Sequence, residues 1–127
     1  MDQQKELEDT FLEEWEATLL LEKEQKYKAT TILLSKALFA LADYIIFQKY
    51  HQLPKNHAER FRILEAKEQK TYKLIDSVWS KYTDTYSKPT AEESIRLLKQ
   101  TIQEVAQYHE NISQAIKTTL KKTSRNH

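Results

Sequence analysis

Apolar residues recur every three or four positions along most of this chain, the spacing that lines one face of an α-helix. Within residues 3–24, Leu7, Phe11 and Trp15 lie four positions apart, so the pattern predicts an amphipathic helix. Residues 27–50 are apolar around most of a helical circumference. That pattern is typical of a helix that lies in the middle of a bundle or in a subunit interface.

Pro54 separates this second helix from the next one, because proline disfavours helical geometry in the residue before it. A short third helix is predicted over residues 56–68, and Asn56 is suited to cap its first turn. Apolar and aromatic residues at helical spacing then predict a fourth helix over residues 70–86.

Pro89 separates the fourth helix from the last one. Thr90 and Glu93 then form the Thr-x-x-Glu pattern of a capping box, in which each side chain binds a free backbone N–H at a helix start. Apolar positions continue at helical spacing as far as Ile116, so we expect one long last helix. Residues 121–127 contain no apolar residue, and we expect this tail to fray.

These elements predict an all-α fold, because no segment shows the two-residue alternation of a half-buried strand. We expect a four- to five-helix bundle that is mainly antiparallel and up-down, since the connections are short. A chain of 127 residues can bury one core. The predicted organisation is a single domain over residues 1–120, followed by a basic tail over residues 121–127.

The composition excludes several functional classes. The chain contains neither Gly nor Cys, so it lacks glycine-rich phosphate-binding loops, disulfides, thiolate metal sites and a cysteine nucleophile. It also lacks the Glu-x-x-His and His-Glu-x-x-His motifs, and we expect neither a metal site nor a cofactor. His109 lies on the apolar stripe of the last helix and is predicted to be a hydrogen-bonded core residue.

The chain shows no predicted signal sequence or membrane span. Residues 1–14 are acidic, whereas a signal peptide would be basic and then apolar. The longest apolar stretch, residues 32–47, has 16 residues and contains Lys36 and Asp43. A membrane span needs about 20 mostly apolar residues. We therefore expect a buried helix and a cytoplasmic protein that does not associate with a membrane.

The net charge of +1 conceals a strong asymmetry along the chain. Residues 1–24 contain nine acidic residues and two lysines, whereas residues 49–73 contain seven Lys or Arg and three acids. Cations beside a helix N-terminus favour phosphate binding. The candidate residues are Lys55, His57, Arg60 and Arg62. The alternative is an ordinary solvated face.

One side of the second helix mixes charged and apolar residues. Lys36 and Asp43 lie seven positions apart and therefore project from the same side. Ile32, Ala40 and Phe47 share that side. This strip is the best candidate for a dimer seam or a ligand-facing edge, and the alternative is a narrow window to solvent.

Three short segments carry a family resemblance. They are Leu41-Ala42-Asp43-Tyr44-Ile45-Ile46 at the end of the apolar helix, Lys55-Asn56-His57 at the next helix start, and Ser80-Lys81-Tyr82-Thr83-Asp84-Thr85-Tyr86. Together with the order of helices, they resemble the HEPN superfamily of small prokaryotic α-helical bundles. The resemblance extends over residues 13–121.

The resemblance implies a bundle that commonly dimerises and is often encoded beside a minimal nucleotidyltransferase. In several branches the family acts as a metal-independent ribonuclease in toxin–antitoxin or defence systems. Those branches carry an Arg and a His with about four to six residues between them, two groups that can reach one phosphodiester. This sequence lacks that pair, and Ser80 and Lys81 stand where the family has an Arg before Asp84.

We therefore expect a non-catalytic HEPN-like module that forms a homodimer. It would bind a protein partner, such as a nucleotidyltransferase, or an anionic nucleotide or RNA. The predicted binding residues are Lys55, His57, Arg60, Arg62, Lys81 and Asp84. The alternative function is a ribonuclease with a displaced site, in which His57 exchanges a proton and Arg60, Arg62 or Lys81 binds phosphate. A third is an adaptor without an anion site.

Overall fold

A computed structural model describes residues 2–86 and 92–125 of the chain. Over these residues the secondary structure is entirely helical, which confirms the predicted all-α class. The elements are α1 (Gln3–Lys23), α2 (Tyr27–Tyr50), α3 (His57–Lys67), α4 (Gln69–Thr83), the 3₁₀ turn η1 (Asp84–Tyr86), α5 (Glu92–Tyr108) and α6 (Gln114–Arg125).

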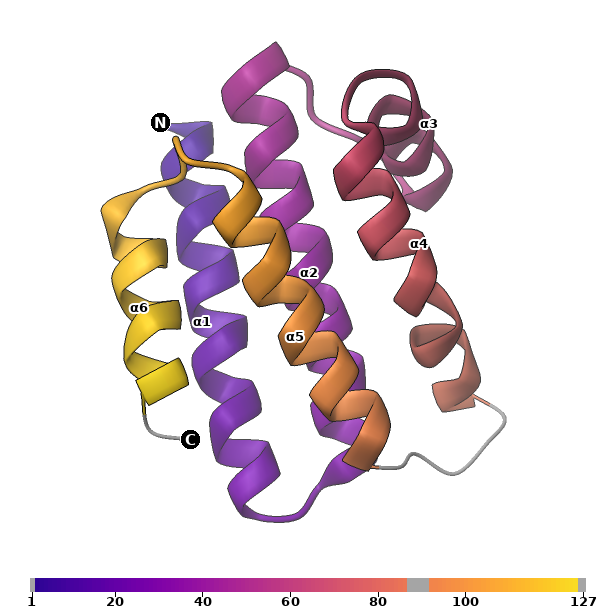
Figure 1. Ribbon diagram of the computed structural model, residues 1–127, viewed down its shortest axis with the longest axis vertical. Helices are drawn as coiled ribbons and strands as arrows, with labels where there is room; N and C mark the ends of the chain where they lie inside the picture. The colour runs from indigo at the N-terminus through magenta and orange to yellow at the C-terminus, as the bar shows by residue number, and fades with distance from the viewer. Residues whose placement is uncertain (1, 87–91, 126–127) are drawn as a thin grey trace.

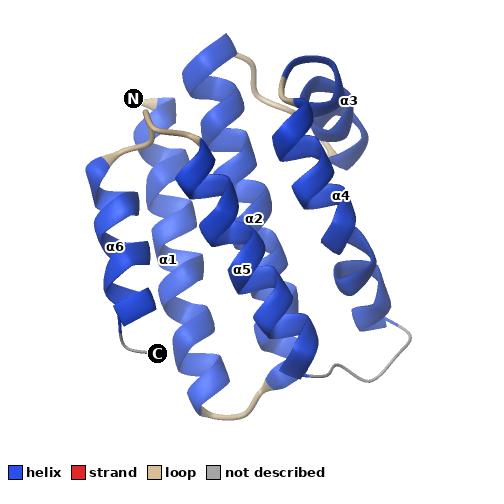
Figure 2. Cartoon of the chain, viewed as in Figure 1, coloured by secondary structure: helices blue, strands red, loops and turns tan. Residues whose placement is uncertain are grey.

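The long helices run alternately up and down, as Figure 1 shows for α1, α2, α4, α5 and α6. Short loops join most of them (Figure 2). The α3 helix lies at the end of the bundle where α2 finishes, and α5 crosses in front of α2 in this view. The first and last helices, α1 and α6, lie side by side.

The α2 helix forms the centre of the core, as its all-round apolar pattern predicts. It packs against α1, α3, α4 and α5. The largest fully buried side chains come from α1, α2, α3, α4 and α5: Trp15, Phe11, Leu34, Leu38, Leu41, Ile45, Ile46, Leu64, Ile75, Ile95, Leu98 and Ile102. Burial of aliphatic and aromatic side chains at about 1.5–3 kcal/mol each is the main stabilising contribution in such a bundle.

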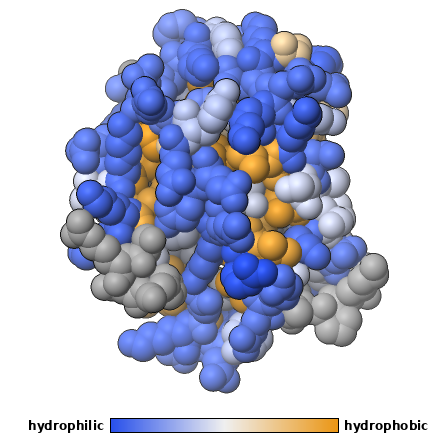
Figure 3. Space-filling model, in the orientation of Figure 1, coloured by the Kyte–Doolittle hydropathy of each residue, from blue (hydrophilic) through white to orange (hydrophobic). Residues whose placement is uncertain are grey.

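The α2 helix is also long and apolar enough to span a membrane. However, 72% of its most apolar 18-residue window is buried inside the bundle, and the core helix of a soluble protein meets the same criteria. The face of the molecule seen in the space-filling view is largely hydrophilic, and hydrophobic residues appear there in patches between hydrophilic ones (Figure 3). The cytoplasmic location stays a prediction.

The predicted helix boundaries agree closely with the structure in the first four helices. The second helix spans residues 27–50 as expected. Asn56 caps α3, because its side chain accepts a hydrogen bond of 2.9 Å from the backbone N–H of Glu59. The predicted fourth helix, residues 70–86, corresponds to α4, which ends at Thr83, and to the 3₁₀ turn η1, which ends at Tyr86. The predicted capping box at Thr90 lies outside the described residues.

The expectation of one long last helix is wrong, and so is the four- to five-helix count. Residues 109–113 interrupt it and leave two helices, α5 and α6. Side chains of α2 bind this connection: Gln48 donates to the carbonyl of Asn111 at 2.6 Å, and the Tyr44 hydroxyl accepts from the Ser113 N–H at 3.1 Å. Ser113 then caps α6 by accepting from the Ile116 N–H. These bonds satisfy backbone groups that a continuous helix would have paired.

The basic tail is more ordered than expected, because α6 continues to Arg125 instead of fraying from Lys121. The apolar stripe Ile112, Ile116 and Leu120 is buried against the bundle. The indole Nε1–H of Trp15 donates a hydrogen bond of 3.2 Å to the Thr123 hydroxyl. Contacts with α1 therefore stabilise a segment whose own composition is polar.

Gln25 occupies a backbone conformation that glycine usually takes. Its φ is 59°, in the left-handed region, directly after the end of α1. The N–H of Gln25 donates to the Glu22 carbonyl and the N–H of Lys26 donates to the Leu21 carbonyl, both at 2.9 Å. This pair of bonds is a Schellman motif, which ends helices on a left-handed residue.

We predict that Gln25→Gly stabilises the protein. A side chain in the left-handed region costs about 1–2 kcal/mol, whereas glycine loses about 0.5–1 kcal/mol more backbone entropy on folding. The free energy of unfolding in urea, followed by circular dichroism, should rise by about 0.5–1 kcal/mol. The matched control Lys23→Gly lies within α1 and should lower it by a similar amount. A loss of stability in Gln25→Gly would contradict this account.

Candidate functional site

The centre of the candidate site is an ion pair between α2 and α3. The Arg60 Nε donates to Asp43 Oδ1 at 2.7 Å, and Nη2 donates to Oδ2 at 2.9 Å. Arg60 is only 8% exposed, and its guanidinium lies 5.1 Å from the centre of the Phe39 ring. Such a bidentate ion pair is strong and directional. It compensates the Arg60 charge inside the protein.

His57 extends this pair into a chain of three polar side chains. Its Nδ1 lies 2.6 Å from Arg60 Nη1. A guanidinium can only donate, so Nδ1 accepts and the imidazole carries its proton on Nε2. The ring also contacts Phe39, Trp79 and Tyr82, with centroids 4.8, 5.0 and 5.8 Å away. His57 is therefore held in one tautomer within an aromatic cluster.

The surroundings of His57 keep it neutral. Burial is the main cause that lowers its pKa from the ordinary value of 6.5, and the positive charge of Arg60 lowers it further. The carboxylate of Asp43 acts in the opposite direction but more weakly. At neutral pH the imidazole can donate from Nε2, whereas its Nδ1 lone pair is occupied by Arg60.

A hollow of about 270 Å³ opens over these residues. Residues from α1, α2, α3 and α4 line it: Leu7, Thr10, Glu14, Lys36, Phe39, Ala40, Asp43, His57, Arg60 and Tyr82. The site thus brings together the first four helices of the chain. It combines aromatic and aliphatic surface with one exposed lysine, Lys36.

The structure brings together only part of the predicted anion-binding set. His57 and Arg60 line the hollow, but Lys55, Arg62, Lys81 and Asp84 are not among the described residues that do so. The Arg62 side chain is 75% exposed and lies 4.0 Å from Glu59. The charge of Arg60 is compensated by Asp43, so this predicted cation is not available to a phosphate.

The predicted strip on α2 coincides with this hollow. Lys36, Ala40 and Asp43 form part of its lining. Ile32 and Phe47, at the two ends of the strip, are half-buried. In the sequence the strip and the cationic segment are separate features, whereas in the fold the Asp43–Arg60 pair joins them.

A second polar cluster, most of which the sequence did not predict, lies where α2, α4 and α5 meet. Glu68, at the junction of α3 and α4, is buried. Its carboxylate accepts from Lys49 Nζ at 2.7 Å and from the Tyr50 hydroxyl. His109 lies 2.6 Å from the Thr71 hydroxyl, which confirms the prediction of a hydrogen-bonded core histidine.

The cluster shifts several pKa values. Burial alone would raise the pKa of Glu68, but the hydrogen bonds of Lys49 and Tyr50 and the positive charge of Lys49 outweigh it and lower that pKa. Burial and the Glu68 carboxylate raise the pKa of Tyr50 to about 12. Burial lowers the pKa of His109, and Glu68 only partly offsets that effect. The cluster therefore holds an ionised Glu68 beside a neutral His109.

This second cluster is better explained as structural than as catalytic. Thr71 and His109 form a hydroxyl–imidazole pair, the arrangement that activates nucleophiles in some hydrolases. However, Thr71 is 0% exposed. Glu68 Oε1 lies 3.8 Å from His109 Nε2, the same nitrogen that contacts the Thr71 hydroxyl. A third group that orients the base would bind its other nitrogen.

The described residues include no group of three or more His, Cys, Asp or Glu side chains that could hold a metal ion. Comparison with known proteins adds no assignment, because no family model, curated protein or solved structure matches the chain. The resemblance to the HEPN superfamily therefore stays a prediction from the sequence.

We predict that Asp43→Asn lowers the free energy of unfolding by about 3–5 kcal/mol, because it leaves the Arg60 charge buried without compensation. The double variant Asp43→Leu with Arg60→Met should lose less, since it removes both charges. The control Glu59→Gln affects the exposed pair with Arg62 and should change stability by less than about 1 kcal/mol. Urea titration measures all three. Equal losses in the single and double variants would refute the argument.

We also predict that stability decreases as the pH falls from 7.5 to 5. His57 and His109 have lowered pKa values in the folded protein, so the unfolded chain binds more protons below pH 6.5. Each histidine can contribute at most about 1.4 kcal/mol per pH unit. Thermal unfolding across this range should show a smaller pH slope in His109→Gln and in His57→Gln. The exposed His51→Gln is the matched control.

Proposed function

We propose that this chain is a non-catalytic helical module that associates with a second copy of itself. The seam would be the α2 strip formed by Ile32, Lys36, Ala40, Asp43 and Phe47. The observation that carries the proposal is that this strip is not fully covered by the other helices. Lys36 is exposed, and Ile32 and Phe47 are partly exposed. The Asp43 side chain is 14% exposed and Ala40 is 7% exposed, so the centre of the strip is more covered than its ends.

The strip is self-complementary in one orientation. If two α2 helices pack antiparallel around a two-fold axis near Ala40, Lys36 of each copy lies opposite Asp43 of the other. Ile32 then lies opposite Phe47 at both ends. A two-fold interface requires that each residue pair occur twice, and this pattern meets that requirement. Ala40 at the centre would let the two backbones approach closely.

The charges favour this orientation over a parallel one. In a parallel two-fold pair each residue faces its own copy, so Lys36 would oppose Lys36 and Asp43 would oppose Asp43. Like charges in an interface repel each other and suppress the wrong arrangement. Asp43 already accepts one hydrogen bond from Arg60 at each oxygen, and each oxygen has a second lone pair for a partner lysine.

The ribonuclease alternative finds less support. Arg60 is compensated by Asp43, and His57 carries its proton on Nε2 and has its other nitrogen occupied. A general base needs a free lone pair within reach of the proton it accepts. RNA cleavage in EDTA that disappears in His57→Ala would contradict the non-catalytic proposal. Binding of RNA or of a nucleotidyltransferase partner, and a HEPN-like arrangement, remain proposals that rest on the sequence resemblance.

We predict that the protein is dimeric at micromolar concentration in size-exclusion chromatography with light scattering. Lys36→Glu should weaken the dimer at least about tenfold, because it places an acid opposite Asp43 of the partner. Lys28→Glu, an exposed lysine near the start of α2, is the matched control. A protein that is strictly monomeric under these conditions would refute the proposal.

The absence of cysteine allows a test of the register. Ala40→Cys should cross-link with itself under mild oxidation, because position 40 lies beside the proposed axis. Ile32→Cys alone should not, since the two copies of position 32 would lie at opposite ends of the seam. The double variant Ile32→Cys with Phe47→Cys should cross-link again. Efficient cross-linking of Ile32→Cys alone would indicate a parallel seam.

A further inference from the structure

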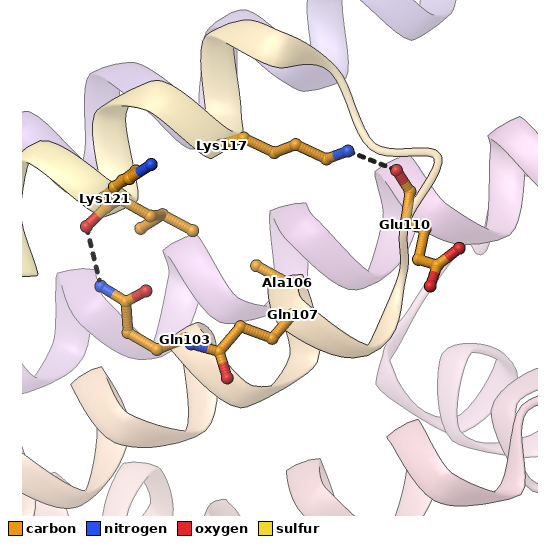
Figure 4. A pocket seen from close by; sticks show the side chains of 7 residues that line it. Gln103, Ala106, Gln107, Glu110, Lys117 and Lys121 are labelled. Atoms are coloured by element: carbon orange, nitrogen blue, oxygen red, sulfur yellow. Dashed lines mark hydrogen bonds between the residues drawn. The ribbon is translucent and has the colours of Figure 1, made fainter.

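A groove of about 420 Å³ lies between α5 and α6, away from the hollow over α2. Figure 4 shows the side chains around it, with Lys117 along one edge and Gln103 and Gln107 along the other. Its volume falls in the range of small-molecule sites, which are about 300–1,000 Å³ and often lie between helices of bundles.

Two lysines on α6 supply positive charge to the groove. Lys117 and Lys121 lie one helical turn apart, so their side chains project from the same face. Among the described residues neither ammonium has a carboxylate within ion-pair distance. Lys117 donates one hydrogen bond, to the backbone carbonyl of Glu110. The Glu110 carboxylate points away from the groove (Figure 4). The two cations are therefore uncompensated.

Two glutamines on α5 face these lysines. The Gln103 Nε2 donates to the Leu120 carbonyl at 3.1 Å, which fixes the amide and leaves its oxygen able to accept. Gln107 also lines the groove and offers amide donors and an acceptor. Ala106 and Leu120, both buried, form the apolar floor. The groove thus has two cations on one side, neutral amide groups on the other side and an apolar floor between them.

We propose that this groove binds a small phosphate monoester with a hydroxyl-bearing body. A phosphate monoester carries a charge of about −1.5 to −2 at neutral pH, which matches two lysines better than the single charge of a carboxylate. The phosphate would bind both Lys117 and Lys121, and Lys117 would exchange its hydrogen bond to the Glu110 carbonyl for one to the phosphate. The amides of Gln103 and Gln107 would then bind the hydroxyl groups of the body, which lies against Ala106 and Leu120.

The charges around α6 favour a small ligand over an extended polyanion. On the other side of α6, Lys122 and Thr119 share a hollow with Glu16 and Glu22 of α1. Lys23 also lines that hollow and Glu22 pairs with Lys99, so a nucleic acid strand along α6 would meet Glu16 there. Among the described residues, Lys117 and Lys121 on the α5-facing side of the helix have no carboxylate within ion-pair distance. This inference is independent of the self-association proposed for α2.

Ribose 5-phosphate is the test ligand, and amide NMR spectra with calorimetry are the readouts. We expect saturable shifts confined to α5 and α6 at millimolar ligand. Ribose, which lacks the phosphate, and gluconate, which offers a carboxylate, should bind at least about tenfold more weakly. Inorganic phosphate separates a site for the whole ester from one for the phosphate alone, and weaker binding of phosphate is expected.

Lys117→Gln and Lys121→Gln should each weaken ribose 5-phosphate at least about tenfold. Lys122→Gln, on the other side of α6, is the matched control and should leave the affinity unchanged within about twofold. The absence of shifts at about 10 mM ligand, equal binding of gluconate, or equal losses in all three variants would each overturn the proposal. So would binding of an RNA oligonucleotide in the groove without binding of the ester.

Discussion

The structure depends on the burial of α2, a helix that is apolar on nearly every side. No single neighbour can cover such a helix, so α1, α3, α4 and α5 each take part of its circumference. Because α2 is buried, each of its buried polar side chains needs a hydrogen-bonding partner. Asp43 accepts hydrogen bonds from Arg60 of α3, and Tyr44 and Gln48 bind the connection between α5 and α6. The polar residues of the central helix thereby position its neighbours.

The Asp43–Arg60 pair has two effects on function. It fixes α3 against α2, and it withdraws from solvent the cation that a phosphate-binding surface would have needed. His57 is drawn into the same arrangement and becomes a neutral donor in an aromatic cluster. A segment that is strongly basic in sequence is therefore less basic as a surface, because Asp43 of another helix neutralises Arg60. Charge counting along a chain cannot detect this, because the compensating acid lies on another helix.

The sequence predicted the helices well where their ends carry local signals, such as Asn56 before α3 and Pro54 after α2. It missed the break at 109–113, because the apolar spacing continues through it and neither Gly nor Pro marks it. The Glu68 cluster could not be anticipated, since its members are distant in the chain and become neighbours only in the fold. Periodicity predicts elements, but it does not identify which polar side chains meet.

The contact between Trp15 and Thr123 joins the first and last helices of the bundle. During synthesis on the ribosome α1 leaves the exit tunnel before α6 is made. The part of its apolar face that packs against α6 is therefore exposed to solvent until then. The bundle is therefore completed only after α6 has left the tunnel. Chaperones that shield apolar helices have their longest opportunity to act on α1 during that interval.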